Sequence, residues 1–94
     1  MYECTLMDTC YECVITERAD TVEGAVTAAY RRMMVPHTDE ETAAVMDIDE
    51  LRCTVPDDEG LQCGKPVAQC VGDFFVVYDG YGVTAPLGLV RRIS

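Results

Sequence analysis

The sequence has no tryptophan, no asparagine and only one residue each of serine, histidine and lysine. The serine is the terminal Ser94 and the histidine is His37, so a serine triad cannot be assembled. No apolar run approaches the roughly 20 residues that a membrane-spanning helix needs. The N-terminal segment carries Glu3 where a secretory signal peptide has positive charge. We therefore expect a cytoplasmic protein with no membrane contact.

The composition is strongly acidic but still apolar enough for a core. The chain has 94 residues, which fits a single domain over residues 1–94, and 49% of them are hydrophobic. Seventeen acidic residues against seven basic ones give a net charge of -10. Phosphate backbones and anionic lipids would repel such a surface, so we expect no direct binding to nucleic acid. A basic protein surface is the partner that this charge favours.

The first third of the chain predicts a hairpin followed by a helix. Residues 2–7 and 10–16 are rich in strand-forming residues and flank a short polar break. Apolar residues then recur at helical spacing over 21–34. Asp20 and Glu23 fit an acidic variant of the capping box, which would begin this helix.

The middle of the chain predicts a second helix and one strand. Thr38 and Glu41 repeat the capping-box spacing, so we expect a short helix over 39–47. Apolar and polar residues nearly alternate from residue 51, and Pro56 ends that pattern. Residues 50–55 are accordingly predicted to form a strand.

The C-terminal third predicts a further hairpin and a last strand. Residues 67–71 and 74–78 are β-rich and flank Gly72 and Asp73, which suit a tight hairpin turn. A final strand is expected within 83–93. Both faces of this hairpin would be apolar, so we expect self-association or a bound partner at one of them, formed by Phe74, Val76 and Tyr78. The predicted fold class is α+β, with two helices packed on a small antiparallel sheet built from β-hairpins.

Six cysteines, at positions 4, 10, 13, 53, 63 and 70, leave three uses open. A structural zinc would use Cys10, Cys13, Cys53 and Cys63, although no second Cys-x-x-Cys pair completes the usual spacing. Disulfides need an oxidising compartment, which the expected cytoplasmic location disfavours. The favoured interpretation is reduced cysteines that act as small buried hydrophobes on strands, notably Cys4, Cys13 and Cys70. No cofactor is expected on this interpretation.

No catalytic constellation is evident. His37 beside a cysteine nucleophile is arithmetically possible, but no particular cysteine is marked for that role. The carboxylates occur in polar clusters, whereas an acid-base pair needs one member in an apolar environment that raises its pKa. We expect a protein that is not an enzyme.

Negative charge is concentrated between residues 39 and 59. Nine acids and one base, Arg52, give these 21 residues a net charge of -8. The acids are Asp39, Glu40, Glu41, Asp47, Asp49, Glu50, Asp57, Asp58 and Glu59. One interpretation is a solvated face that keeps the protein in solution, and another is salt adaptation, for which the low lysine content would be typical. The uneven distribution favours a third interpretation, a binding face.

Together these features predict a non-enzymatic acidic binding module that engages a basic protein surface. In size and charge alone it resembles acidic inhibitors that occupy nucleic-acid-binding sites, such as phage counter-defence proteins. Two alternatives come from other classes. One is a small zinc-binding structural module, and the other is a homo-oligomeric structural protein.

Overall fold

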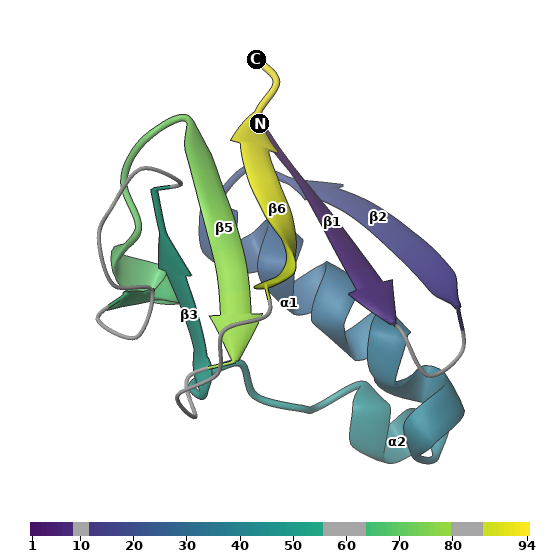
Figure 1. Cartoon of the computed structure of the whole chain (residues 1–94). Helices are drawn as coiled ribbons and strands as arrows, with labels where there is room; N and C mark the ends of the chain where they lie inside the picture. The colour runs from purple at the N-terminus through teal and green to yellow at the C-terminus, as the bar shows by residue number, and fades with distance from the viewer. Residues whose placement is uncertain (9–11, 56–63, 80–85) are drawn as a thin grey trace.

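The computed structural model describes residues 1–8, 12–55, 64–79 and 86–94, and it confirms the α+β class (Figure 1). The strands are β1 (Tyr2–Asp8), β2 (Cys13–Ala19), β3 (Leu51–Thr54), β4 (Lys65–Pro66), β5 (Phe74–Asp79) and β6 (Pro86–Arg92). The α-helices are α1 (Val22–Met34) and α2 (Glu40–Ala43), and the 3-10 helices are η1 (Val35–His37) and η3 (Val67–Gln69). The fold is mostly sheet, with one main helix, so the predicted pair of helices packed on the sheet is not observed: α2 is a single turn.

The strands of the described residues form one antiparallel sheet in the order β2-β1-β6-β5-β3-β4. The first predicted hairpin is confirmed, because β1 pairs with β2 and places Tyr2 opposite Ala19. The last strand, β6, lies between β1 and β5, so the two ends of the chain meet (Figure 1). There the ammonium group of Met1 donates a hydrogen bond of 3.0 Å to the backbone oxygen of Ser94. Pairing of the first and last strands makes the sheet continuous.

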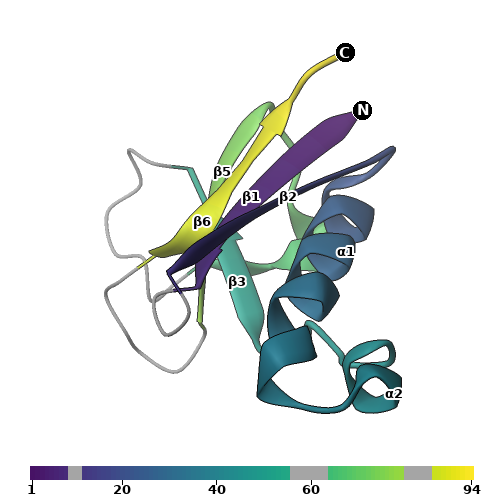
Figure 2. The same cartoon turned by 90° about the vertical axis from the view of Figure 1, so that its right-hand side faces the viewer.

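Helix α1 covers one face of the sheet, as Figure 2 shows. Its buried stripe has the predicted 3.6-residue spacing and consists of Val22, Ala25, Val26, Ala29 and Met33. The N-cap is Thr21 rather than the predicted Asp20, because the Thr21 hydroxyl accepts a hydrogen bond of 3.0 Å from the Gly24 backbone N–H. No helix of the described residues is long and apolar enough to cross a membrane.

The core lies between α1 and the sheet. The strands contribute alternate residues to it, and those that are almost completely buried include Cys4, Leu6, Leu51, Cys53, Phe75, Val77 and Val90. Gly88 on β6 faces the backbone of β1 so closely that a Cβ atom there would collide with the Thr5 carbonyl oxygen. Glycine is therefore required at this position by the close approach of two strands.

The predicted helix over 39–47 is wrong in length and in its cap. Helix α2 spans only Glu40–Ala43, and the residue that caps it is Asp39 rather than Thr38. Past this turn, the Asp47 carboxylate accepts a hydrogen bond from the Asp49 backbone N–H at 3.1 Å. Directly after Ala43 the backbone bonds have tighter spacing, because Val45 donates to the Thr42 carbonyl oxygen at 3.2 Å and Met46 to that of Ala43 at 3.3 Å. The α-helical pattern therefore ends within one turn. The neighbouring strand prediction, 50–55, is confirmed by β3.

The predicted hairpin over 67–78 is also wrong. Strands β4 and β5 pair with opposite edges of β3, so the chain between them must cross β3 and cannot make a two-residue turn. Residues 67–69 form η3 within this crossover, and Val71 is 91% exposed. Strand β5 pairs instead with β6, which confirms a last strand that begins at Pro86. Residues 83–85 of that prediction lie outside the described residues.

Candidate functional site

The predicted acidic residues that the structure describes are all exposed to solvent. They lie between the end of η1 and the start of β3, in residues 39–50, which we call the acidic segment. Its acids are Asp39, Glu40, Glu41, Asp47, Asp49 and Glu50. The other three predicted residues, Asp57, Asp58 and Glu59, lie outside the described residues. The apolar residues Ala43 and Ile48 are buried and anchor the segment to the rest of the protein.

Hydrogen bonds within the acidic segment give its backbone a defined shape. Asp39 accepts hydrogen bonds from the Thr42 backbone N–H at 2.8 Å and from the Thr42 hydroxyl at 2.9 Å. These bonds lower the pKa of Asp39, because they favour its ionised form. Asp39 therefore has a structural role as a cap, whereas Glu40 and Glu41 extend from the first turn of α2 into solvent.

The carboxylates of this region lie close enough to repel one another. A hydrogen bond and charge repulsion from Asp47 raise the pKa of Asp49, and repulsion from Glu23 on α1 raises it further. The pKa of Tyr30 is also raised, first by burial and then by the charges of Glu50 and Asp79. Negative charge therefore extends from the acidic segment onto α1 and the end of β5.

The two arginines beside the acidic segment bond to its backbone. Arg31 donates from Nε to the Met46 carbonyl oxygen at 3.1 Å. Arg52 donates from one terminal nitrogen to the carbonyl oxygens of Asp49 and Leu51. Elsewhere, Arg18, Arg32, Arg91 and Arg92 form ion pairs with carboxylates outside the segment. The neighbouring arginines thus hold the chain in place through its carbonyl groups.

A cavity of about 220 Å³ adjoins the acidic segment, between α1, β3 and η3. Its apolar lining comes from Ile48, Pro66, Val67 and Ala68. Carboxylates from two different elements, Glu23 and Asp49, also line it, together with Arg52. Glu23 could not be recognised as a site residue from the sequence. It lies 16 residues before the acidic segment and is next to that segment only in the folded chain.

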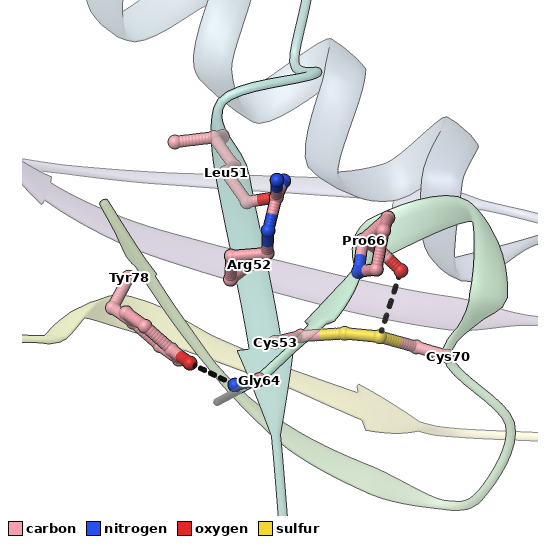
Figure 3. The surroundings of a disulfide bond; sticks show 7 residues. All are labelled: Leu51, Arg52, Cys53, Gly64, Pro66, Cys70 and Tyr78. Carbon is pink, nitrogen blue, oxygen red and sulfur yellow. Dashed lines mark hydrogen bonds between the residues drawn. A yellow bond between two sulfur atoms is a disulfide. The ribbon is translucent and has the colours of Figure 1, made fainter. Parts of the chain in front are cut away.

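A disulfide between Cys53 and Cys70 ties the crossover onto β3 (Figure 3). This corrects the prediction that Cys70 is a reduced core residue, and it takes Cys53 out of the proposed zinc set. Disulfides persist in oxidising compartments, so this bond argues against the cytoplasmic location expected from the sequence. Of the remaining predicted zinc ligands, Cys13 is a half-buried free thiol, and Cys10 and Cys63 lie outside the described residues.

The remaining candidate for catalysis, a cysteine with His37 as base, gains no support. Among the described residues, the free cysteines are Cys4 and Cys13. Burial raises the pKa of the Cys4 thiol to about 12, which makes it unreactive at neutral pH. His37 Nε2 lies 2.7 Å from Oδ2 of Asp8, a buried carboxylate at the end of β1. This contact joins η1 to the sheet.

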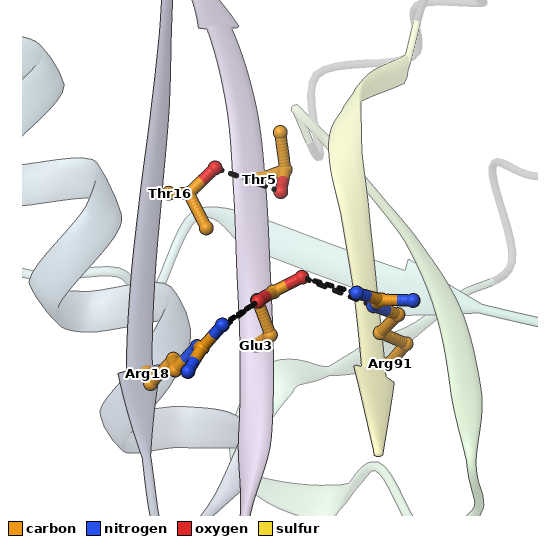
Figure 4. Close-up of polar contacts among 5 residues, drawn as sticks. All are labelled: Glu3, Thr5, Thr16, Arg18 and Arg91. Atoms are coloured by element: carbon orange, nitrogen blue, oxygen red, sulfur yellow. Dashed lines mark hydrogen bonds and ion pairs between the residues drawn. The ribbon is translucent and has the colours of Figure 1, made fainter. Parts of the chain in front are cut away.

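The sheet face opposite α1, which we call the open face, carries no helix among the described residues (Figure 2). On this face the Glu3 carboxylate accepts hydrogen bonds from Arg18 and Arg91, each at 3.0 Å (Figure 4). These bonds, first that from Arg91, lower the pKa of Glu3. Beside them Thr5 and Thr16 share a hydrogen bond of 3.1 Å. This cluster could not be predicted from the sequence, because Glu3 and Arg91 are 88 residues apart in the chain.

The open face also carries exposed apolar side chains. Strand register places Met7 opposite Val14 and Phe74 opposite Arg91, all on the open face. Met7, Val14, Phe74 and Leu89 are between 38% and 63% exposed. Tyr78 shares a face of β5 with Val76, as predicted, because the register with β3 is regular. It is buried rather than exposed, and its phenolic oxygen accepts a hydrogen bond of 2.6 Å from the Gly64 backbone N–H (Figure 3). The register shift at this point lies in the pairing with β6, where Val77 faces Gly88 and Tyr78 faces Pro86, so β5 itself keeps its alternation.

The chain was compared with protein-family models, curated proteins and solved structures. None of the three comparisons found a match.

Proposed function

We propose that the protein is a non-enzymatic binding module whose acidic segment engages a basic protein surface. One observation carries the proposal: the six described acids of the segment are exposed, while the adjacent Arg31 and Arg52 bond to backbone carbonyls. The carboxylates of these acids therefore face solvent, and hydrogen bonds fix the conformation of the backbone that carries them. Charge arranged in this way accelerates association with a basic partner and selects against acidic ones.

The class of partner follows from the same charge. A basic surface that binds nucleic acid presents clustered lysines and arginines, and a compact array of carboxylates competes for them. By analogy with acidic inhibitors, the protein would occupy such a site and exclude the nucleic acid. Competition between nucleic acid and this protein for the basic partner tests this extension.

The experiment is a pull-down at low and high salt with nucleic acid as competitor, followed by association kinetics with the purified partner. Reversal of Glu40 and Glu41 to lysine should slow association at least about tenfold, because charges at an interface rim act mainly on that rate. Asp39 is left unchanged, because it caps α2. The matched control reverses Glu12 and Asp20, two exposed acids outside the segment. Equal effects of the two double reversals, or binding that salt does not weaken, would refute the proposal.

A second proposal, self-association, concerns the open face. This face carries four exposed apolar side chains, and the carboxylate of Glu3 is paired with two arginines. Two copies of an acidic protein would meet there with little repulsion between carboxylates. Sedimentation of the wild type and of Leu89→Lys at high concentration tests this proposal. A wild type that stays monomeric would reject it.

A further inference from the structure

The cavity beside the acidic segment combines an apolar floor with carboxylates at its edge. Ile48 and Val67 are buried beneath it, at 7% and 3% exposure. Glu23 and Asp49 are exposed and come from α1 and from the chain before β3. Within the described residues Glu23 makes no ion pair or hydrogen bond through its side chain. The cavity thus offers apolar contact and negative charge in one place.

We propose that this cavity receives one lysine or arginine side chain of the basic partner, an inference that rests on the function proposed above. Both side chains have an aliphatic stem and a cationic head. The stem would lie on Ile48 and Val67, and the head would bond to the Glu23 and Asp49 carboxylates. Ligands that lack either part would leave half of the cavity unused.

Arg52 shows that a cation is compatible with this environment. It lines the cavity, projects beside Pro66 of the paired strand (Figure 3), and donates its hydrogen bonds to backbone carbonyl oxygens. The lining therefore carries two carboxylates and one guanidinium, a net charge of -1. The Glu23 and Asp49 carboxylates repel each other, and a second cation placed between them would relieve that repulsion.

The disulfide supports the wall of the cavity. Pro66 ends β4, and Val67 and Ala68 follow it in η3 before Cys70. The bond from Cys70 to Cys53 holds this stretch against β3. Reduction should loosen the wall and weaken binding of the side chain. The acidic segment precedes β3 in the chain, so reduction of the disulfide should leave its carboxylates exposed and charged.

The test uses three capped tripeptides as probes, with lysine, arginine or norleucine between two glycines. They are titrated into the isotopically labelled full chain and followed by amide chemical shifts. The lysine or the arginine peptide, or both, should cause saturable shifts at Glu23, Asp49, Val67 and Ala68. Norleucine has the stem without the charge and should cause no saturable shift there. Shifts that do not saturate, or that spread evenly over all exposed acids, would overturn the inference.

Variants separate this inference from the proposed function. Glu23→Gln with Asp49→Asn should weaken peptide binding at least about fivefold, because the charged hydrogen-bond acceptors are lost. The control, Glu12→Gln with Asp73→Asn, removes the same charge at exposed sites that do not line the cavity. The single variant Glu23→Gln repeats the test should the double variant fail to fold. Equal affinity in variant and control overturns the cavity site alone, provided that Glu40 and Glu41 reversal still slows association with the partner.

Discussion

Reduction of the Cys53–Cys70 disulfide should lower the free energy of unfolding by about 3 kcal/mol. The two cysteines are 17 residues apart, and a cross-link closing a loop of that length restricts the unfolded chain by this amount in the chain-entropy model. Single domains have unfolding free energies of about 5–15 kcal/mol, so the loss is a large share of the total. The midpoint of thermal unfolding should fall by about 12–24 °C.

The assay is urea unfolding of the same protein with and without reductant, with complete reduction verified by mass spectrometry. Comparing the two forms leaves every side chain in place, so no cavity term contributes. The double variant Cys53→Ala with Cys70→Ala serves as control, because its stability should not respond to reductant. Equal unfolding midpoints for the oxidised and fully reduced wild type would refute the reasoning. That result would mean that the crossover is held against β3 by packing alone.

Four further predictions concern the sheet and the charge. Glu3→Gln should be less stable than the wild type at pH 7 in urea unfolding. This difference in stability should shrink as the pH falls below 4.5, because the pKa of Glu3 is lowered in the folded protein and its carboxylate stabilises the fold only while it is ionised. Gly88→Ala should cost about 1–3 kcal/mol in the same assay, because its Cβ collides with β1. Cys4 should resist a thiol reagent in the folded protein while Cys13 reacts, as peptide mapping after a short labelling pulse would show. Circular dichroism should show a folded protein in dilute buffer, whereas salt adaptation predicts folding only at molar salt.

The sequence alone determined those elements whose signals are local. The apolar stripe of α1 repeats every 3.6 residues, and helical hydrogen bonds join neighbouring residues, so the helix 21–34 could be predicted almost to its ends. The hairpin of β1 and β2 joins strands that are close in the chain, so two β-rich runs around a polar break could predict it. The acidic segment was visible in the same way, because its charge is contiguous in the sequence.

Only the tertiary structure decided what depends on pairing distant segments. Nothing near Val67 signals that β4 and β5 take opposite edges of β3, so a β-rich run was predicted as a hairpin where the chain in fact crosses over. That crossover brings Cys70 to Cys53 and places Val67 beneath Glu23 and Asp49. The Glu3 cluster likewise exists because the last strand returns to the first. Charge clusters and hydrophobic periodicity are local properties of the sequence. A cavity or an ion-pair cluster forms only where the strand order of the sheet brings distant segments together.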